Sequence, residues 1–182
     1  RDAARVSAVM EAIETHCAET IMAPLKFASV EELRFTHRIA DVGALPLTAI
    51  EGVDPDLPFL WIEGRDLIGG GDRWTPFEMV HANYAVPEPA HSGALAATTN
   101  GLASGNTRDE ALLHALLEVI ERDAETLWKL GPNAWTGKTA IQPGSIDDPL
   151  CRGLLDQFEA AGIDVAIWDV TSDIGAPTFL AL

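Results

Sequence analysis

TTNGLASGNTRDEALLHALLEVIERDAETLWK, residues 98–129, is the stretch that decides the fold of this chain. Its first part is a loop rich in glycine, asparagine and serine, and its second part has the period of a long amphipathic helix. Gly101, Gly105 and Asn106 are expected to supply unusual backbone angles in the loop. A glycine-rich turn before a helix presents free N–H groups and a positive dipole end, so it is suited to bind a phosphate.

The predicted helix carries its acidic side chains on one side. Thr107 stands three residues before Glu110, a spacing that predicts a capping box at the helix start. Carboxylates at i and i+4 repel each other by a few tenths of a kcal/mol per pair, so we expect a positive partner. At about 100° per residue the following polar residues fall within an arc of about 80°: Glu110, His114, Glu118, Glu121 and Glu125.

Residues 2–20 form a second predicted helix, which also has a polar side. Ser7, Glu11 and Glu14 fall within about 60° of one another on it. Glu-Ala-Ile-Glu at 11–14 and Glu-Val-Ile-Glu at 118–121 are near copies, which ordinary helical patterning explains more readily than an internal duplication. The apolar sides of both helices are expected to face a core: Val6, Val9, Met10, Ile13 and Cys17 on the first, and Leu112, Leu113, Leu116, Leu117, Val119, Ile120 and Leu127 on the second.

Composition limits the classes of partner. With 182 residues, 47% of them hydrophobic, the chain has the size of one globular domain, residues 1–182. The 28 acidic and 12 basic residues give a net charge of −16, which argues against nucleic acids and anionic membranes and favours cations. Two distant cysteines indicate a reducing compartment, which we expect to be the cytoplasm. The sequence contains no apolar run near the roughly 20 residues that span a bilayer.

The remaining segments predict an α/β fold of the α+β type, a sheet packed with helices. Gly69, Gly70 and Gly71 mark the turn of a hairpin. The same glycines would suit a phosphate, but the Lys-Ser/Thr of a nucleotide-binding P-loop does not follow them. Helices are predicted at 30–33 and 150–161, the second ending at Gly162, and strands at 57–62, 74–76, 79–86, 164–168 and, in the centre of a sheet, 178–182.

The carboxylates of the two helices suggest a metal site. Magnesium is usually held by a few carboxylates together with the phosphates of a substrate, and the glutamates would supply such a set if the two helices faced each other. A solvated helix surface gives the same pattern. Arg122 would either offset phosphate charge or pair with Glu118 at i+4. Di-iron carboxylate bundles use Glu-x-x-His, whereas Glu110 and His114 here stand four residues apart, so that class is disfavoured.

Three segments together resemble a known family. TTNGLASGNTRDEALLHALLEVIERDA looks like the central signature of the YcaO family, and VSAVMEAIE resembles its Ser-x-x-x-Glu-x-x-Glu segment. GIDVAIWDVTSDIGAPTF is similar to its helix-then-strand segment ending in a Gly-x-Pro turn. The resemblance covers most of the chain. It implies an ATP-binding fold of the YcaO type, with ATP and Mg²⁺ as cofactors.

The resemblance also assigns roles to residues. It implies that Mg²⁺ is held by Glu11, Glu110, Glu118 and Glu121, and that the nucleotide is contacted by Ser7, Glu14, Asn106 and Arg122. One departure is visible, because Thr15 stands where many members of the family have arginine.

The implied activity is phosphorylation of a peptide-backbone amide oxygen by ATP. An attack by a neighbouring Cys, Ser or Thr of the peptide would give an azoline, and an attack by external sulfide would give a thioamide. The substrate is then a peptide or protein, and a partner protein would deliver the peptide or the sulfur; a homodimer is left open. The alternative is a non-catalytic scaffold or adaptor of a modification complex.

The resemblance is expected to be incomplete. The family's later Gln-x-x-x-Glu segment and its proline-rich C-terminus have no counterpart before Leu182. We therefore expect residues 1–182 to correspond to the N-terminal and central part of a YcaO-like domain and to lack turnover by themselves.

Overall fold

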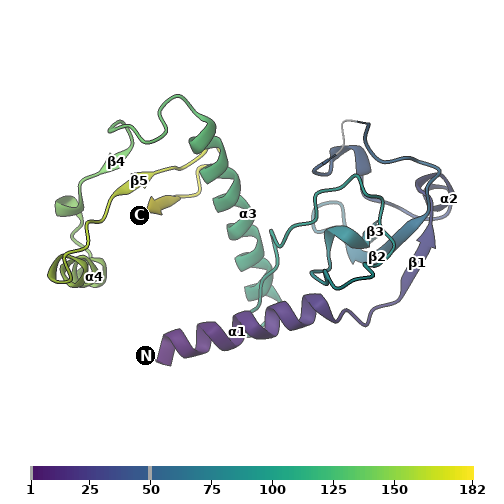
Figure 1. Cartoon of the computed structure of the whole chain (residues 1–182), viewed down its shortest axis with the longest axis horizontal. Coiled ribbons are helices and arrows are strands. Elements are labelled where there is room, and N and C mark those ends of the chain that lie inside the picture. The colour runs from purple at the N-terminus through teal and green to yellow at the C-terminus, as the bar shows by residue number, and fades with distance from the viewer. Residues whose placement is uncertain (1, 49–50) are drawn as a thin grey trace. The chain divides into compact units, whose positions relative to one another are not determined.

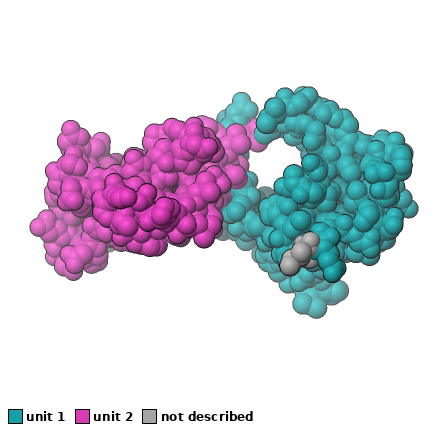
Figure 2. All heavy atoms as spheres, turned by 90° about the horizontal axis from the view of Figure 1, so that it is seen from above, with its two compact units in different colours: residues 1–111 teal, residues 112–182 magenta. Residues whose placement is uncertain are grey.

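A computed structural model describes residues 2–48 and 51–182 of the chain. The chain divides into two compact units, residues 1–111 and residues 112–182, which are coloured separately in Figure 2. We refer to them as the N-terminal unit and the C-terminal unit. Each contains helical segments and a small antiparallel sheet of three strands (Figure 1), so the predicted α+β type of fold is confirmed.

The N-terminal unit is built around the sheet β1-β2-β3. The predicted hairpin is confirmed, because Trp61 of β2 pairs with Pro76 of β3 and Ile62 pairs with Thr75. A complete capping box starts α2, in which Ser29 and Glu32 each accept a hydrogen bond from the other's backbone N–H. The elements of this unit are α1 (Asp2–Glu19), β1 (Leu25–Ala28), α2 (Val30–Arg34), the 3₁₀ turn η1 (Val42–Ala44), β2 (Phe59–Arg65), β3 (Asp72–Pro76), the 3₁₀ turn η2 (Phe77–Met79) and the start of α3 (Arg108–Leu130).

The core of the N-terminal unit centres on two aromatic rings of β2. Phe59 and Trp61 are fully buried and stack with their ring centroids 4.8 Å apart. The indole N–H of Trp61 donates to the carbonyl of Ala28 on the neighbouring strand at 2.9 Å, so the polar edge of the buried ring is satisfied. Around them pack Leu33, Val42, Trp74 and Leu95, with further partly buried apolar residues.

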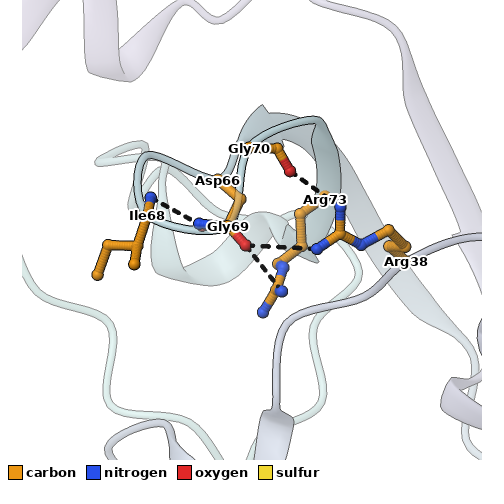
Figure 3. A network of polar contacts seen from close by, with 6 residues as sticks. All are labelled: Arg38, Asp66, Ile68, Gly69, Gly70 and Arg73. Atoms are coloured by element: carbon orange, nitrogen blue, oxygen red, sulfur yellow. Dashed lines mark hydrogen bonds and ion pairs between the residues drawn. The ribbon is translucent and has the colours of Figure 1, made fainter.

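The glycine-rich turn between β2 and β3 is closed by the carboxylate of Asp66 (Figure 3). Asp66 Oδ1 accepts hydrogen bonds from the N–H groups of Ile68 at 3.0 Å and Gly69 at 2.8 Å. Its Oδ2 forms an ion pair with Arg73 at 2.8 Å and lies 3.6 Å from Arg38. The N–H groups that a phosphate would need are therefore already bound, and the turn belongs to the hairpin.

Acid should weaken this turn, and Asp66→Asn should remove that dependence. The N–H groups of Gly69 and Ile68, assisted by Arg73 and Arg38, hold the pKa of Asp66 below its ordinary value of 3.8. A carboxyl with a lowered folded-state pKa contributes stability above its unfolded-state pKa and loses it as pH falls through the folded-state value. Urea unfolding measured from pH 6 down to about pH 3 should therefore show a shallower pH slope in Asp66→Asn than in the wild type. The exposed Asp72→Asn is the control, and an equal slope in both variants would contradict this role of Asp66.

The C-terminal unit contains the rest of α3 and a second sheet, β4-β5-β6. Asp148 caps α4 by accepting from the N–H groups of Leu150 and Cys151. At the other end Gly162 has a φ of 70°, and its N–H donates to Glu159, so the predicted glycine stop is confirmed. The elements are β4 (Ala140–Ile141), the 3₁₀ turn η3 (Pro143–Ser145), α4 (Pro149–Ala160), β5 (Ile167–Asp169) and β6 (Phe179–Ala181).

Three tryptophans pack together in the C-terminal unit. The ring centroids of Trp128, Trp135 and Trp168 lie between 5.0 and 5.8 Å apart, in edge-on and tilted arrangements. The indole N–H of Trp128 donates to the hydroxyl of Thr139 at 3.0 Å. The cluster ties the end of α3 to the sheet, since Trp168 lies in the middle of β5.

Several sequence-based expectations are wrong. Residues 79–86 are not a strand: after η2 the chain turns, and His81 and Asn83 each accept a backbone N–H from two residues further on. Among the described residues β6 is an edge strand, and β5 is the central one. Among the described residues of the N-terminal unit, the apolar side of α1 contributes nothing to the main cluster of buried residues. About half of the side-chain surface is exposed at Val6, Val9, Ile13, Leu113, Leu116, Leu117, Val119 and Leu127.

No helix within residues 2–48 and 51–182 has the length and apolarity required to cross a bilayer.

Candidate functional site

The start of α3 joins two of the predicted site residues directly. Thr107 accepts a hydrogen bond from the N–H of Glu110 at 3.2 Å, so the predicted N-cap is confirmed. The other half of the predicted capping box is wrong, because the Glu110 carboxylate binds Asn106, the residue before Thr107. The carboxylate accepts from the backbone N–H of Asn106 at 2.9 Å and from the Asn106 side-chain amide at 3.3 Å. Asn106 therefore fixes the orientation of the Glu110 carboxylate.

The loop before α3 depends on two glycines for different reasons. Gly101 has a φ of 82°, the left-handed conformation that was predicted for it. Gly105 is needed for space, because a Cβ placed on it would lie 2.6 Å from the backbone nitrogen of Ala111 and 3.0 Å from the Cβ of Glu110. The loop backbone therefore lies against the first turn of α3, and this contact brings Asn106 to Glu110.

The contact leaves Glu110 able to bind a cation. An ionised carboxylate has two oxygens with about four acceptor positions. Asn106 uses one position on each oxygen, and the Glu110 side chain is exposed. Oxygen ligands of this kind suit a hard cation such as Mg²⁺.

The predicted residues of α1 lie along one helix of the N-terminal unit. Ser7 and Glu11 are exposed and Glu14 is half-buried. Glu11 borders a shallow depression on the helix surface, which Thr15, His16 and Glu19 also line. The side chains are accessible to a ligand.

The other predicted residues lie on the part of α3 that belongs to the C-terminal unit. Glu118 is half-buried, and Glu121 and Arg122 are exposed. Glu125, the next acidic residue of the predicted arc, forms an ion pair with Lys129 at 2.6 Å. The positive partner expected for the acidic side is thus present for Glu125 one turn later.

Within the N-terminal unit, then, Glu110 and Asn106 are brought into contact, and Ser7, Glu11 and Glu14 share α1. In either unit taken by itself, the described residues include no group of three or more His, Cys, Asp or Glu side chains placed to hold a metal ion. The convergence of the two acidic helices around one nucleotide remains a prediction.

Several solved structures have the same fold. A heterocyclase in complex with substrate and cofactor superposes with a TM-score of 0.73 and 22% identity, over 95% of this chain and 25% of its own. YcaO from Methanopyrus kandleri, bound with AMPPCP and Mg²⁺, superposes with a TM-score of 0.62 and 22% identity, over 91% of this chain and 38% of its own. These likenesses show the fold.

The sequence profile of the family described as YcaO cyclodehydratase, ATP- and Mg²⁺-binding, matches residues 1–182. The chain belongs to the YcaO family. An uncharacterized protein encoded in the tfuA 3′ region of Rhizobium leguminosarum bv. trifolii is 35% identical over 185 residues, covering all of this chain and 42% of that protein. The chain thus spans less than half the length of this YcaO relative. ATP and Mg²⁺, predicted from the resemblance, are confirmed as the ligands of the family.

Two features of the N-terminal unit were not predicted from the sequence. Gly105 was assigned a backbone-angle role, whereas its close approach to α3 follows from tertiary packing that no sequence pattern reveals. A cavity beside the buried side chains of Glu78 and His81 was also missed, because that segment was assigned to a strand. The prolines and the Asn83 turn signal that follow His81 were the available clues against the strand.

Proposed function

We propose that this chain is the N-terminal and central part, residues 1–182, of an ATP- and Mg²⁺-dependent enzyme that phosphorylates a peptide-backbone amide oxygen. The observation that carries the proposal is the contact between Asn106 and Glu110 at the start of α3. The family resemblance assigns Asn106 to the nucleotide and Glu110 to Mg²⁺, and the contact between them lies at a helix N-terminus, which is suited to bind phosphate.

The donor set fits the proposed ligands. Glu11, Glu110, Glu118 and Glu121 would hold Mg²⁺, and Ser7, Glu14, Asn106 and Arg122 would contact the nucleotide. Carboxylate oxygens are the ligands that Mg²⁺ prefers. The guanidinium of Arg122 matches phosphate oxygens in geometry and charge.

The residues of the chain would act by positioning and electrostatics. Asn106 holds the Glu110 carboxylate in one orientation through two hydrogen bonds, so little reorganisation is needed when a ligand binds. Arg122 would place positive charge beside the phosphates. Mg²⁺, when bound, would neutralise the triphosphate and stabilise charge on the transferred group.

The phosphorylated oxygen would then leave the peptide as inorganic phosphate, and one of two products would form, depending on the group that had attacked the carbonyl carbon. A neighbouring Cys, Ser or Thr of the substrate peptide gives an azoline, and external sulfide gives a thioamide. A partner protein that delivers the peptide or the sulfur would decide between them, and a homodimer is compatible with either. The two free, exposed cysteines, Cys17 and Cys151, suit a reducing compartment such as the cytoplasm.

The test uses the full-length protein with ATP, Mg²⁺ and a peptide containing Cys, Ser and Thr, in the presence and absence of sulfide. Peptide-dependent formation of ADP and phosphate is expected, with loss of water from the peptide for an azoline or replacement of oxygen by sulfur for a thioamide, read by mass spectrometry. Mg²⁺-dependent ATP binding is measured on the same sample by calorimetry. Failure to bind ATP with Mg²⁺ would refute the proposal, and binding without any peptide modification would favour a scaffold.

A further inference from the structure

The N-terminal unit contains a cavity, lined by apolar surface together with several polar side chains, that the proposed chemistry does not use. Its volume is about 180 Å³, and one continuous segment, residues 78–97, supplies the lining residues. Small-molecule sites typically measure about 300–1,000 Å³. This cavity therefore suits the end of a side chain better than a nucleotide.

The first polar group of the cavity is the imidazole of His81, which is only 7% exposed. Its Nδ1 accepts the backbone N–H of Asn83 at 3.1 Å, so in the neutral ring the proton is on Nε2. Burial lowers the pKa of His81, which keeps the ring neutral at physiological pH. Phe77 stacks on the ring at 4.6 Å and holds its plane. His81 thus presents a hydrogen-bond donor, Nε2–H, from a fixed position.

The second polar group is the carboxylate of Glu78, which is only 6% exposed. Its Oε1 accepts the backbone N–H of Ser92 at 2.8 Å. No hydrogen bond to Oε2 is found within residues 2–48 and 51–182. Glu78 thus offers the cavity an acceptor. Tyr84, Glu88 and His91 complete the polar lining, and Nε2 of His91 lies 3.5 Å from a carboxylate oxygen of Glu88.

This donor and acceptor select the ligand by elimination. A cation such as an ammonium group has no lone pair for the Nε2–H of His81, which would stay unpaired. A carboxylate or phosphate would be repelled by Glu78 and Glu88 and has no proton for Glu78. An apolar group would leave both buried polar groups unsatisfied, at the cost of their desolvation. A hydroxyl group can also accept and donate, but it does both through a single oxygen atom. A carboxamide uses two separate atoms, its C=O oxygen and its NH₂ nitrogen, which suits a donor and an acceptor that belong to two different side chains.

We propose that the cavity around Glu78 and His81 binds a carboxamide, with the amide C=O on His81 Nε2–H and the amide N–H on Glu78. The expected source is the side chain of an Asn or Gln of the modified polypeptide, and this source rests on the proposed function. A side chain enters the cavity by its end alone, whereas a peptide bond is flanked by backbone on both sides. The cavity would thereby select substrate sequence away from the reacting amide.

The test titrates the full-length protein, ¹⁵N-labelled at histidine, with small probes while the ring nitrogens of His81 are followed by NMR. Acetamide is expected to give a saturable shift of Nε2. N,N-dimethylacetamide cannot donate and should bind at least about tenfold more weakly, because Glu78 then lacks its hydrogen bond. Methanol, which has a single oxygen, should bind at least about tenfold more weakly than acetamide, and methylammonium and acetate should give no saturable shift. An equal response to methanol or to either ion, or none to acetamide, would overturn the proposal, and equal binding of N-methylacetamide would overturn the side-chain source.

Glu78→Gln supplies a second readout. An amide at this position turns an N–H towards the probe and should weaken acetamide binding at least about tenfold, whereas the exposed Glu63→Gln should leave it unchanged. The probe series on the unaltered protein decides the question even if Glu78→Gln fails to fold. Mg²⁺-dependent ATP binding on the same sample separates the two proposals. If ATP binds but acetamide gives no response, only the carboxamide site is refuted. If acetamide binds but ATP does not, the ATP-dependent function is refuted, together with the Asn or Gln source that rests on it.

Discussion

Glu118→Gln and Glu121→Gln, each made in the full-length protein, should lower peptide-dependent ATP turnover by about 10²-fold or more. Glutamine keeps the shape of the side chain but removes the negative charge that would hold the cation. Mg²⁺-dependent ATP binding should weaken in parallel in calorimetry. Raising the Mg²⁺ concentration should partly restore binding, since the lost interaction is with the metal.

Two neighbours on the same helix are the matched controls. Glu125 already pairs with Lys129 at 2.6 Å, and Asp123 is exposed. Glu125→Gln and Asp123→Asn remove the same charge from α3 and should leave turnover within about a factor of two to three, as surface substitutions usually do. If all four variants behave alike, the general charge of the helix and not a metal site explains the effect.

Trp61→Ala should destabilise the N-terminal unit by about 3–5 kcal/mol. The ring is fully buried, stacks on Phe59 and donates to the carbonyl of Ala28. Its removal leaves a cavity and an unpaired carbonyl in the same place. Because folded domains have only about 5–15 kcal/mol of stability, much of this unit should open. Hydrogen exchange of the β1 and β2 amides measures the loss.

Trp61→Phe separates the two contributions. Phenylalanine retains the stacking partner for Phe59 but lacks the N–H that reaches Ala28. Its cost should be smaller, about 1–3 kcal/mol for the unpaired buried carbonyl together with a small cavity. Equal protection loss in Trp61→Ala and Trp61→Phe would contradict the central packing role of the ring.

The parts of this fold that follow from local chemistry were predictable. The period of residues 2–20 and 98–129, the Thr107 cap and the Gly162 stop locate α1, α3 and the end of α4 to within a few residues. Three successive glycines between apolar runs were sufficient for the β2-β3 hairpin. Caps and turns are set by neighbours in the sequence, and so a sequence reveals them.

The features that depend on distant contacts were not predictable. Residues 79–86 alternate like a strand, yet no neighbouring strand pairs with them within the described residues, and side chains bind their N–H groups instead. The stripe on α3 has the period of a core-facing helix, but Leu113 is 59% exposed. For the site, the residues of each helix face were predictable, whereas the bond between Asn106 and Glu110 was not.

The position of Gly105, at the start of α3, has no room for a side chain. Any side chain larger than hydrogen would overlap with the backbone of Ala111 and displace the loop from the helix. The hydrogen bond from the Asn106 N–H to the Glu110 carboxylate would then be lost. Changes elsewhere in residues 98–104 leave that overlap untouched. Variants that probe this loop should therefore keep Gly105 for its lack of a side chain and Gly101 for its φ of 82°, and change the other positions of residues 98–104.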